Sequence, residues 1–201
     1  MNDVKGLRVI ITGASGMVGE GVLFECLRNE AVSSVLVVGR RLCGTTHPKM
    51  KEIIHADFTN LAPVENALSG YDACFFCLGI SSLGMKEETY RAITYDVTMH
   101  MANTLLKMNA AISFCYVSGA GTDTIEKGRL MWARIKGKTE NDLAALPFKA
   151  AYNFRPGMLI PTAGQHNILK AYKYFSWLVP IMKAVYPKGI CSLEALGKAM
   201  I

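Results

Sequence analysis

The chain has 201 residues, of which 51% are hydrophobic, and its formal net charge is +6. This length suffices for one domain with its own hydrophobic core, and no uncharged apolar run reaches about 18 residues, which excludes a membrane-spanning helix. The basic residues are spread along the chain rather than gathered with aromatic residues in one tract, so we expect no nucleic-acid partner.

From the N-terminus onward, short apolar runs alternate with segments of helical period. We predict strands at 8–12, 34–38, 52–56, 73–77, 113–117 and 151–155. Between them we predict helices at about 17–28, 61–68, 87–109 and 129–145. Apolar strands alternating with helices are typical of a parallel sheet covered on both faces. We therefore predict an α/β fold class, a doubly wound parallel sheet (Rossmann fold), with residues 1–201 as a single domain. The first residues contain no apolar stretch of signal-peptide length, so we expect a cytoplasmic protein.

The first predicted strand runs directly into TGASGMVGEG, where three glycines recur at intervals of three residues before a helix. This spacing allows a tight turn, close approach of the backbone to a pyrophosphate, and close packing of the helix on the strand. The N–H groups at the start of the helix then bind the anion. The alternative is a glycine-rich turn without a ligand. The predicted cofactor contacts in this loop are Gly13, Ser15, Gly16, Met17, Val18 and Gly19.

Arg40 and Arg41 follow the second predicted strand, 21 and 22 residues after Gly19. An NAD-binding protein places an acidic residue there to bind the ribose 2′-hydroxyl, whereas an arginine pairs with a 2′-phosphate. The sequence thus favours NADP(H) over NAD(H) as the cofactor. The alternative is a pair of solvated surface arginines.

The six cysteines lie mostly in apolar contexts, so we expect free thiols in a reducing compartment. Cys74 and Cys77 have the C-x-x-C spacing of redox and zinc sites, but a strand places residues i and i+3 on opposite faces. The four histidines are far apart in the sequence. We predict no metal site.

After residue 160 the pattern changes. Residues 166–187 are apolar and aromatic with interspersed lysines, and Pro180 breaks any single helix. Three interpretations are open: short helices packed on the sheet edge, a substrate lid, or a membrane-surface helix, of which membrane contact is the least favoured. We predict a small C-terminal helical substrate or lid segment over 160–201. The helical pattern at 192–201 favours a natural chain that continues past Ile201.

Together these motifs resemble the short-chain dehydrogenase/reductase superfamily, in its atypical and extended branches, which include nitrogen-repression regulators, a Tat-interacting NADPH-binding protein and nucleotide-sugar epimerases. The resemblance rests on TGASGMVG, GRR, ADF, CLG, YVSGAG, WARIKGKTE and FRPGMLIP in this order. It implies that Asp57 and Phe58 contact the adenine, that Leu78 and Gly79 lie near the ribose, and that Pro156, Gly157 and Met158 lie at the nicotinamide end. It also implies a homodimer formed through the helices near 87–109 and 129–145.

The catalytic set of this superfamily is incomplete here. Members carry a serine pair after the fifth strand and then a Tyr-x-x-x-Lys helix; Ser118 matches the first serine, but the second falls on Gly119 and the tyrosine falls on Trp132. Lys136 remains, and the resemblance gives it a role in binding the cofactor ribose. An indole N–H does not ionise near neutral pH, so Trp132 does not act as a general acid. Residues 137–139 end like a P-loop, but Trp132 occupies the place of that motif's first glycine.

Other hydroxyl groups would have to supply the proton. The candidates from the sequence are Tyr95, Tyr116, Tyr152, Thr122 and Thr124. We therefore predict an NADP(H)-binding protein that is an atypical oxidoreductase or nucleotide-sugar-epimerase-like enzyme with an unidentified small-molecule substrate, and Ser118 and Lys136 as its catalytic residues. The alternative is a non-catalytic NADP(H)-sensing regulator that acts through a protein partner.

Overall fold

The computed structural model describes residues 6–168 and 189–201. Within them, six parallel strands form one sheet in the order β3-β2-β1-β4-β5-β6. The strands are β1 (Leu7–Thr12), β2 (Val32–Gly39), β3 (Met50–Ile54), β4 (Ala73–Phe76), β5 (Ser113–Val117) and β6 (Ala150–Phe154). The strand order reverses between β1 and β4, which is the switch point of a doubly wound sheet. The predicted α/β fold class is confirmed, and all six predicted strands are present.

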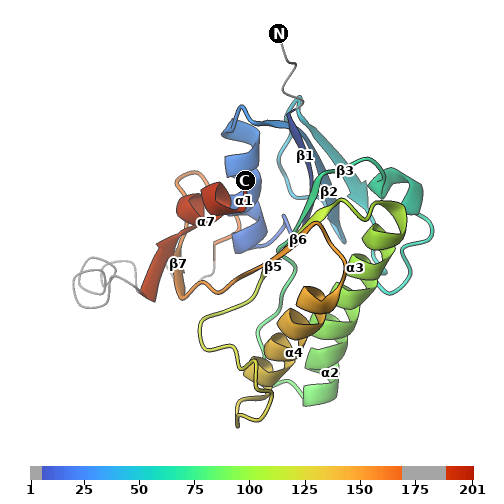
Figure 1. Ribbon diagram of the computed structural model, residues 1–201. Coiled ribbons are helices and arrows are strands. Elements are labelled where there is room, and N and C mark those ends of the chain that lie inside the picture. The colour runs from blue at the N-terminus through green and yellow to red at the C-terminus, as the bar shows by residue number, and fades with distance from the viewer. Residues whose placement is uncertain (1–5, 169–188) are drawn as a thin grey trace.

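Helices cover both faces of this sheet (Figure 1). On one face lie α1 (Met17–Arg28) and α7 (Leu193–Met200), and on the other lie α3 (Val97–Met108) and α4 (Met131–Ala145). The short helix α2 (Glu87–Arg91) and a π-helical segment η2 (Ala92–Asp96) lead into α3. The helix predicted over 87–109 is thus present as three consecutive helical segments, of which the second is a π-helix.

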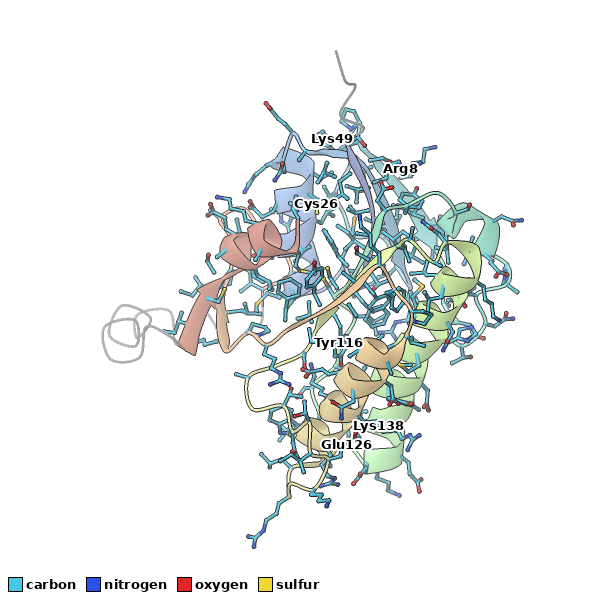
Figure 2. All side chains as sticks on the ribbon, viewed as in Figure 1. Arg8, Cys26, Lys49, Tyr116, Glu126 and Lys138 are labelled. Atoms are coloured by element: carbon cyan, nitrogen blue, oxygen red, sulfur yellow. The ribbon has the colours of Figure 1, made fainter. Side chains whose placement is uncertain are left out.

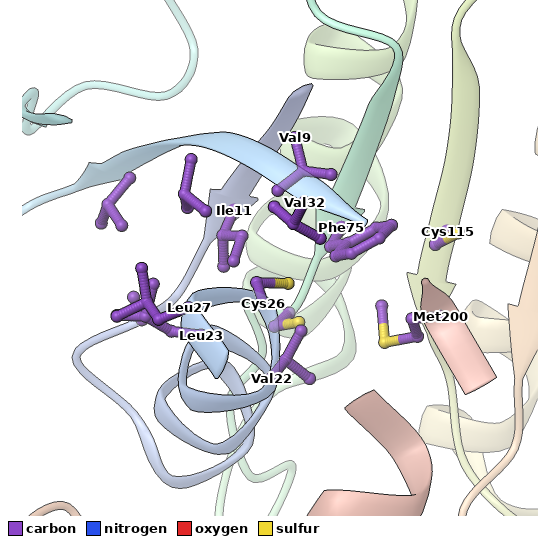
Figure 3. Close-up of a cluster of buried hydrophobic side chains, with 14 of the residues drawn as sticks. Val9, Ile11, Val22, Leu23, Cys26, Leu27, Val32, Phe75, Cys115 and Met200 are labelled. Atoms are coloured by element: carbon purple, nitrogen blue, oxygen red, sulfur yellow. The ribbon is translucent and has the colours of Figure 1, made fainter. Parts of the chain in front are cut away.

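Each face of the sheet packs into its own hydrophobic core. On the α1 side, Val9, Ile11 and Phe75 lie in one buried cluster with Val22 and Cys26 of the helix (Figure 3). On the α3 and α4 side, the alternate strand residues pack with Met101, Leu105 and Leu143. Because both faces are buried, the strands read as unbroken apolar runs in the sequence.

The two cysteines of the C-x-x-C spacing lie in different cores, on opposite faces of the sheet. Cys74 lies in the α3 side core, whereas Cys77 lies in the α1 side core. The opposite-face prediction is confirmed for this pair. Burial also raises the pKa of both thiols, which keeps them protonated.

The predicted helix at 61–68 is wrong in length and type. Only a 3-10 helix, η1 (Glu65–Leu68), forms there. Pro63 lacks a backbone N–H, and the side-chain oxygens of Asp57 and Asn60 accept hydrogen bonds from Thr59 N and Ala62 N. Such local side-chain bonds compete with helix formation.

The C-terminal part contains more than helix. β7 (Met158–Ile160) and β8 (Ile190–Ser192) form a separate two-stranded parallel sheet. The helical pattern predicted at 192–201 is α7, whose Leu193 and Leu196 are buried against α1. Most of the apolar segment 166–187 lies outside the described residues, so its packing, lid and membrane interpretations stay predictions. No helix in the described ranges is both long and apolar enough to cross a membrane.

Candidate functional site

A cavity of about 840 Å³ opens at the carboxyl ends of the strands, beside the switch point between β1 and β4. Ligands of doubly wound folds bind at this position. Its wall combines the loop before α1 and the first turn of α1, the end of β2, the loop after β4, α2, η2, the end of β5, α4, the turn after β6, and β7. The lining residues are Gly13, Ser15, Gly16, Met17, Val18, Gly39, Arg40, Arg41, Cys77, Leu78, Gly79, Ile80, Ser81, Tyr90, Thr94, Tyr116, Val117, Ser118, Lys136, Pro156, Gly157 and Leu159.

The glycine loop is shaped by close backbone contacts. Gly13 has a φ of +73°, and a Cβ at this position would lie 2.8 Å from the backbone of Cys77. A Cβ at Gly19 would lie 2.2 Å from the carbonyl oxygen of Gly13. Gly16 is the N-cap of α1 and provides no side-chain cap, so the first N–H groups of the helix remain available to an anion. Gly19 shapes the loop but does not line the cavity.

Both predicted arginines line the cavity. The Arg41 guanidinium donates to the carbonyl oxygen of Ser15 at 3.2 Å, so its side chain folds over the glycine loop. Arg40 is exposed and forms no hydrogen bond or ion pair with the described part of the chain. Arg40 is therefore the one of the two whose guanidinium is available to a ligand phosphate.

Besides Gly19, three predicted cofactor contacts do not line the cavity: Asp57, Phe58 and Met158. Phe58 is buried in the α3 side core. The Asp57 carboxylate accepts hydrogen bonds from the amide and hydroxyl of Thr59, which hold its pKa below the usual range. Neither side chain lies in the cavity wall, and the predicted adenine contact stays a prediction. The other predicted nicotinamide-end residues, Pro156 and Gly157, do line the cavity.

Lys136 reaches the end of β5 from α4. Its Nζ donates to the carbonyl oxygens of Ser118 at 2.8 Å and Val117 at 3.3 Å. The ammonium also lies 5.6 Å from the centre of the Tyr116 ring, which sits between the sheet and α4 (Figure 2). Burial lowers the pKa of Lys136 to about 8, because desolvation disfavours the charged amine.

Trp132 is absent from the cavity wall. Its indole packs on the turn after β5, where Cβ atoms at Gly119 and Gly121 would lie 3.9 Å and 3.5 Å from the ring. The glycine in place of the second serine therefore faces the tryptophan in place of the tyrosine. The two departures from the superfamily pattern are neighbours in space.

The hydroxyl groups proposed from the sequence are mostly elsewhere. Tyr95 donates to Asp142 outside the cavity, Tyr152 is exposed on β6, and Thr124 does not line the wall. Thr122 contacts the Ser118 hydroxyl at 2.9 Å and donates to the Gly119 carbonyl. Of the predicted tyrosines only Tyr116 lines the cavity.

Sequence reasoning missed Tyr90 and Thr94. They line the cavity from α2 and η2, and Tyr90 is only 2% exposed. A signal was present, because the predicted helix at 87–109 follows the fourth strand and so begins at the carboxyl edge of the sheet, where ligands bind.

A buried carboxylate links the cavity to the segment after β7. Glu20, in α1, accepts hydrogen bonds from the backbone amides of His166 at 2.9 Å and Asn167 at 2.8 Å. Gln165 donates to the Met17 carbonyl at 2.7 Å. Residues 162–167 are thus docked on the first turn of α1, beside the cavity wall.

An ion pair joins α4 to the residue that follows β6. Glu140 of α4 is buried, and its carboxylate accepts two hydrogen bonds from Arg155 Nε, at 3.0 Å and 3.1 Å, and one from an η-nitrogen. Arg155 immediately precedes the lining residues Pro156 and Gly157. This pair therefore joins α4, which carries Lys136, to the turn after β6.

Comparison with known proteins gives a family and several relatives. A model of the family described as NAD dependent epimerase/dehydratase matches residues 9–125. Rat Protein HTATIP2 is 28% identical over 154 residues, covering 76% of this chain and 62% of its own length. A protein named fmp52, mitochondrial, from Emericella nidulans is 26% identical over 166 residues, covering 79% of this chain and 68% of its own. The chain thus spans about three fifths of the rat relative.

Two solved structures share the fold. ADP-L-glycero-D-manno-heptose-6-epimerase from Helicobacter pylori superposes with a TM-score of 0.70 at 16% identity, covering 100% of this chain and 73% of the epimerase. A short chain dehydrogenase from Burkholderia cenocepacia in complex with NADP has a TM-score of 0.65 at 16% identity, with coverages of 98% and 83%. The resemblance predicted from the sequence motifs is confirmed. The fungal relative carries the word mitochondrial in its name. The cytoplasmic location that the sequence predicts for this chain therefore stays a prediction.

Proposed function

This chain belongs to the NAD dependent epimerase/dehydratase family, and from that premise we propose that it is an NADP(H)-dependent oxidoreductase or epimerase-like enzyme acting on a small molecule. One observation carries the proposal: a single cavity joins the glycine loop and Arg40 to Ser118 and Lys136. A nicotinamide enzyme needs this continuity, because the protein must orient the reactive end of the cofactor against the substrate.

The residues present fit a dinucleotide. The uncapped first turn of α1 and the glycine loop would hold the pyrophosphate, and Lys136 lies in the wall of the same cavity. When bound, the cofactor supplies or accepts a hydride. The protein's own contribution is to bind and orient the substrate near Ser118 and Lys136. It must also donate or accept the proton that accompanies hydride transfer.

Arg40 supports the choice of NADP(H). We expect Arg40→Asp to weaken NADPH binding roughly tenfold or more, because a charge-assisted hydrogen bond to a phosphate contributes about 1.5–3 kcal/mol. NADH has no 2′-phosphate, so its affinity should fall much less. Calorimetric titration with both cofactors measures this difference.

Arg129→Asp is the matched control, because Arg129 is exposed and lies outside the cavity wall, while the change in net charge is the same. Equal losses of NADPH and NADH affinity in the Arg40 variant would contradict the 2′-phosphate contact.

A second candidate function is a regulator that binds NADP(H) without turnover and acts through a protein partner. The observation that favours it is the placement of Trp132, which stands in the position of the superfamily's tyrosine and lies outside the cavity wall. Cofactor binding needs the glycine loop, Arg40 and Lys136, none of which depends on the missing hydroxyl.

Trp132→Tyr separates the two candidates. We expect NADPH affinity to stay within about threefold, because the indole does not line the cavity and such substitutions shift free energies by only about 0.5 kcal/mol. Trp132→Phe is the control that changes the packing without adding a hydroxyl. Carbonyl reduction that appears only in the tyrosine variant would favour the regulator, whereas a collapse of NADPH binding would show that the indole belongs to the cofactor site.

The proposed function is tested by titrating the purified protein with NADPH and NADH and then following nicotinamide absorbance with a panel of carbonyl compounds and nucleotide sugars. NADPH-selective binding with oxidation of the cofactor is the expected result. Selective binding without any absorbance change would favour the regulator, and absence of binding would overturn both candidates.

A further inference from the structure

Four ionisable side chains other than arginines line the cavity: Cys77, Tyr90, Tyr116 and Lys136. Burial raises the pKa of the thiol and of both phenols, so these three groups hold their protons near neutral pH and are weak acids there. Lys136 differs, because burial moves its pKa down toward neutrality. An efficient general acid has a pKa near the pH at which the enzyme works.

The surroundings of Lys136 leave one of its protons for a ligand. Two N–H groups are used by the carbonyl oxygens of Val117 and Ser118, and an ammonium has three. No carboxylate of the described residues lies within ion-pair distance of its Nζ. The nearest acidic influence is Glu140, whose carboxylate is bound by Arg155.

The hydroxyl groups of Ser118 and Thr122 have no proton to give to a ligand. Thr122 donates its single proton to the Gly119 carbonyl, so the contact between the two hydroxyls is a donation from Ser118 to Thr122. Ser118 therefore presents oxygen lone pairs to the cavity and is an acceptor there. Of Ser118, Thr122 and Lys136, Lys136 is therefore the one that keeps a proton for a ligand.

We propose that Lys136 is the general acid of the reaction and protonates the carbonyl oxygen of the substrate through Nζ, in place of the tyrosine hydroxyl that Trp132 lacks. This inference rests on the proposed oxidoreductase function. In the reduction, a C–H bond forms at the carbonyl carbon with the hydride that NADPH supplies as it is oxidised to NADP⁺. The C=O π electrons move to the oxygen, which takes the proton from Nζ. The neutral amine then regains a proton from water.

The first test reads the amine directly. Competitive labelling with isotopic acetic anhydride over about pH 6 to 11, read by peptide mass spectrometry, reports the fraction of neutral amine at each lysine. Lys136 should become half reactive near pH 8. Lys138 is the internal reference, because its bond to Asp142 raises its pKa. NADPH should protect Lys136 and leave Lys138 unchanged. Parallel titration of the two lysines would overturn the proposal.

The second test is Lys136→Arg, which keeps a positive hydrogen-bond donor but does not release a proton near neutral pH. We expect NADPH affinity within about tenfold of the wild type and a loss of carbonyl reduction of about 100-fold or more. Lys138→Arg, outside the cavity, is the matched control and should reduce carbonyls normally. The wild-type rate should fall as the pH rises through about 8, because only the ammonium donates a proton.

The outcomes separate the two proposals. Turnover that survives in Lys136→Arg, or that does not fall above pH 8, overturns the role of Lys136 and leaves the oxidoreductase standing. Labelling at Lys136 as expected, with NADPH binding but no turnover on any substrate, overturns the oxidoreductase function itself and the acid role with it.

Discussion

Replacing Gly137 with alanine is expected to lower the free energy of unfolding by about 3 kcal/mol, near the upper end of the usual cost of overpacking. A Cβ at this position would lie 1.8 Å from the carbonyl oxygen of Asp123 and 2.4 Å from its carbonyl carbon. The loop that carries Asp123 cannot easily move away. Its amide donates to the Ala133 carbonyl, and its carboxylate accepts from the amides of Ile125 and Gly128.

Chemical denaturation measures the change, and Gly79→Ala is the control. A Cβ at Gly79 meets no atom within 4 Å, so this substitution should alter stability by less than about 1 kcal/mol. Equal stability of the two variants would mean that the loop after β5 shifts freely away from α4. The expected result would also explain why α4 has a glycine at position 137, because the loop at Asp123 packs directly against the helix backbone there.

Replacing Arg155 with methionine is expected to cost about 3 kcal/mol, because it leaves the carboxylate of Glu140 buried without its cation. The Glu140 side chain is 4% exposed, whereas that of Arg155 is 44% exposed. Water therefore screens part of the interaction, and the effect should lie at the lower end of the range for broken buried pairs. Thermal and urea unfolding of the variant measure it.

The double variant Glu140→Gln with Arg155→Met is the control for this effect. Removing the buried charge together with its partner should restore much of the lost stability. A double variant as unstable as Arg155→Met alone would show that packing, and not the unpaired carboxylate, causes the loss. NADPH affinity is a useful second measurement, because the pair joins the helix of Lys136 to Pro156 and Gly157.

Much of the fold could be predicted because burial on both sheet faces leaves a continuous apolar signature in each strand. All six predicted strands are present, and the loop from Gly13 to Gly19 lies at the switch point as expected. The helix predicted at 61–68 is wrong because two local features override its helical period. Pro63 lacks a backbone N–H, and the side-chain oxygens of Asp57 and Asn60 accept hydrogen bonds from nearby backbone amides. Those bonds involve single side chains, which a periodicity does not reveal.

The candidate site was predicted less completely than the fold. Gly13, Gly16, Arg40, Ser118 and Lys136 line the cavity, because each follows or faces the end of a strand. Phe58 matched a short motif, yet its ring is buried in the core, since a match of three letters does not specify where a side chain points. Tyr90 was missed because a tyrosine on an amphipathic helix has the same appearance in sequence whether it faces a core or a cavity.

The amino-acid sequence by itself determined the strand and helix alternation, the glycine loop, the arginine pair after β2 and the loss of the tyrosine at Trp132, because each of these depends on residue type and local spacing. Only the tertiary structure decided that the Glu140 carboxylate meets Arg155, that the Gly137 surface meets Asp123, and that the Lys136 amine is buried beside Ser118. These contacts join residues 14 to 18 positions apart on different elements. Their geometry and the desolvation of Lys136 arise only when the helices pack on the sheet.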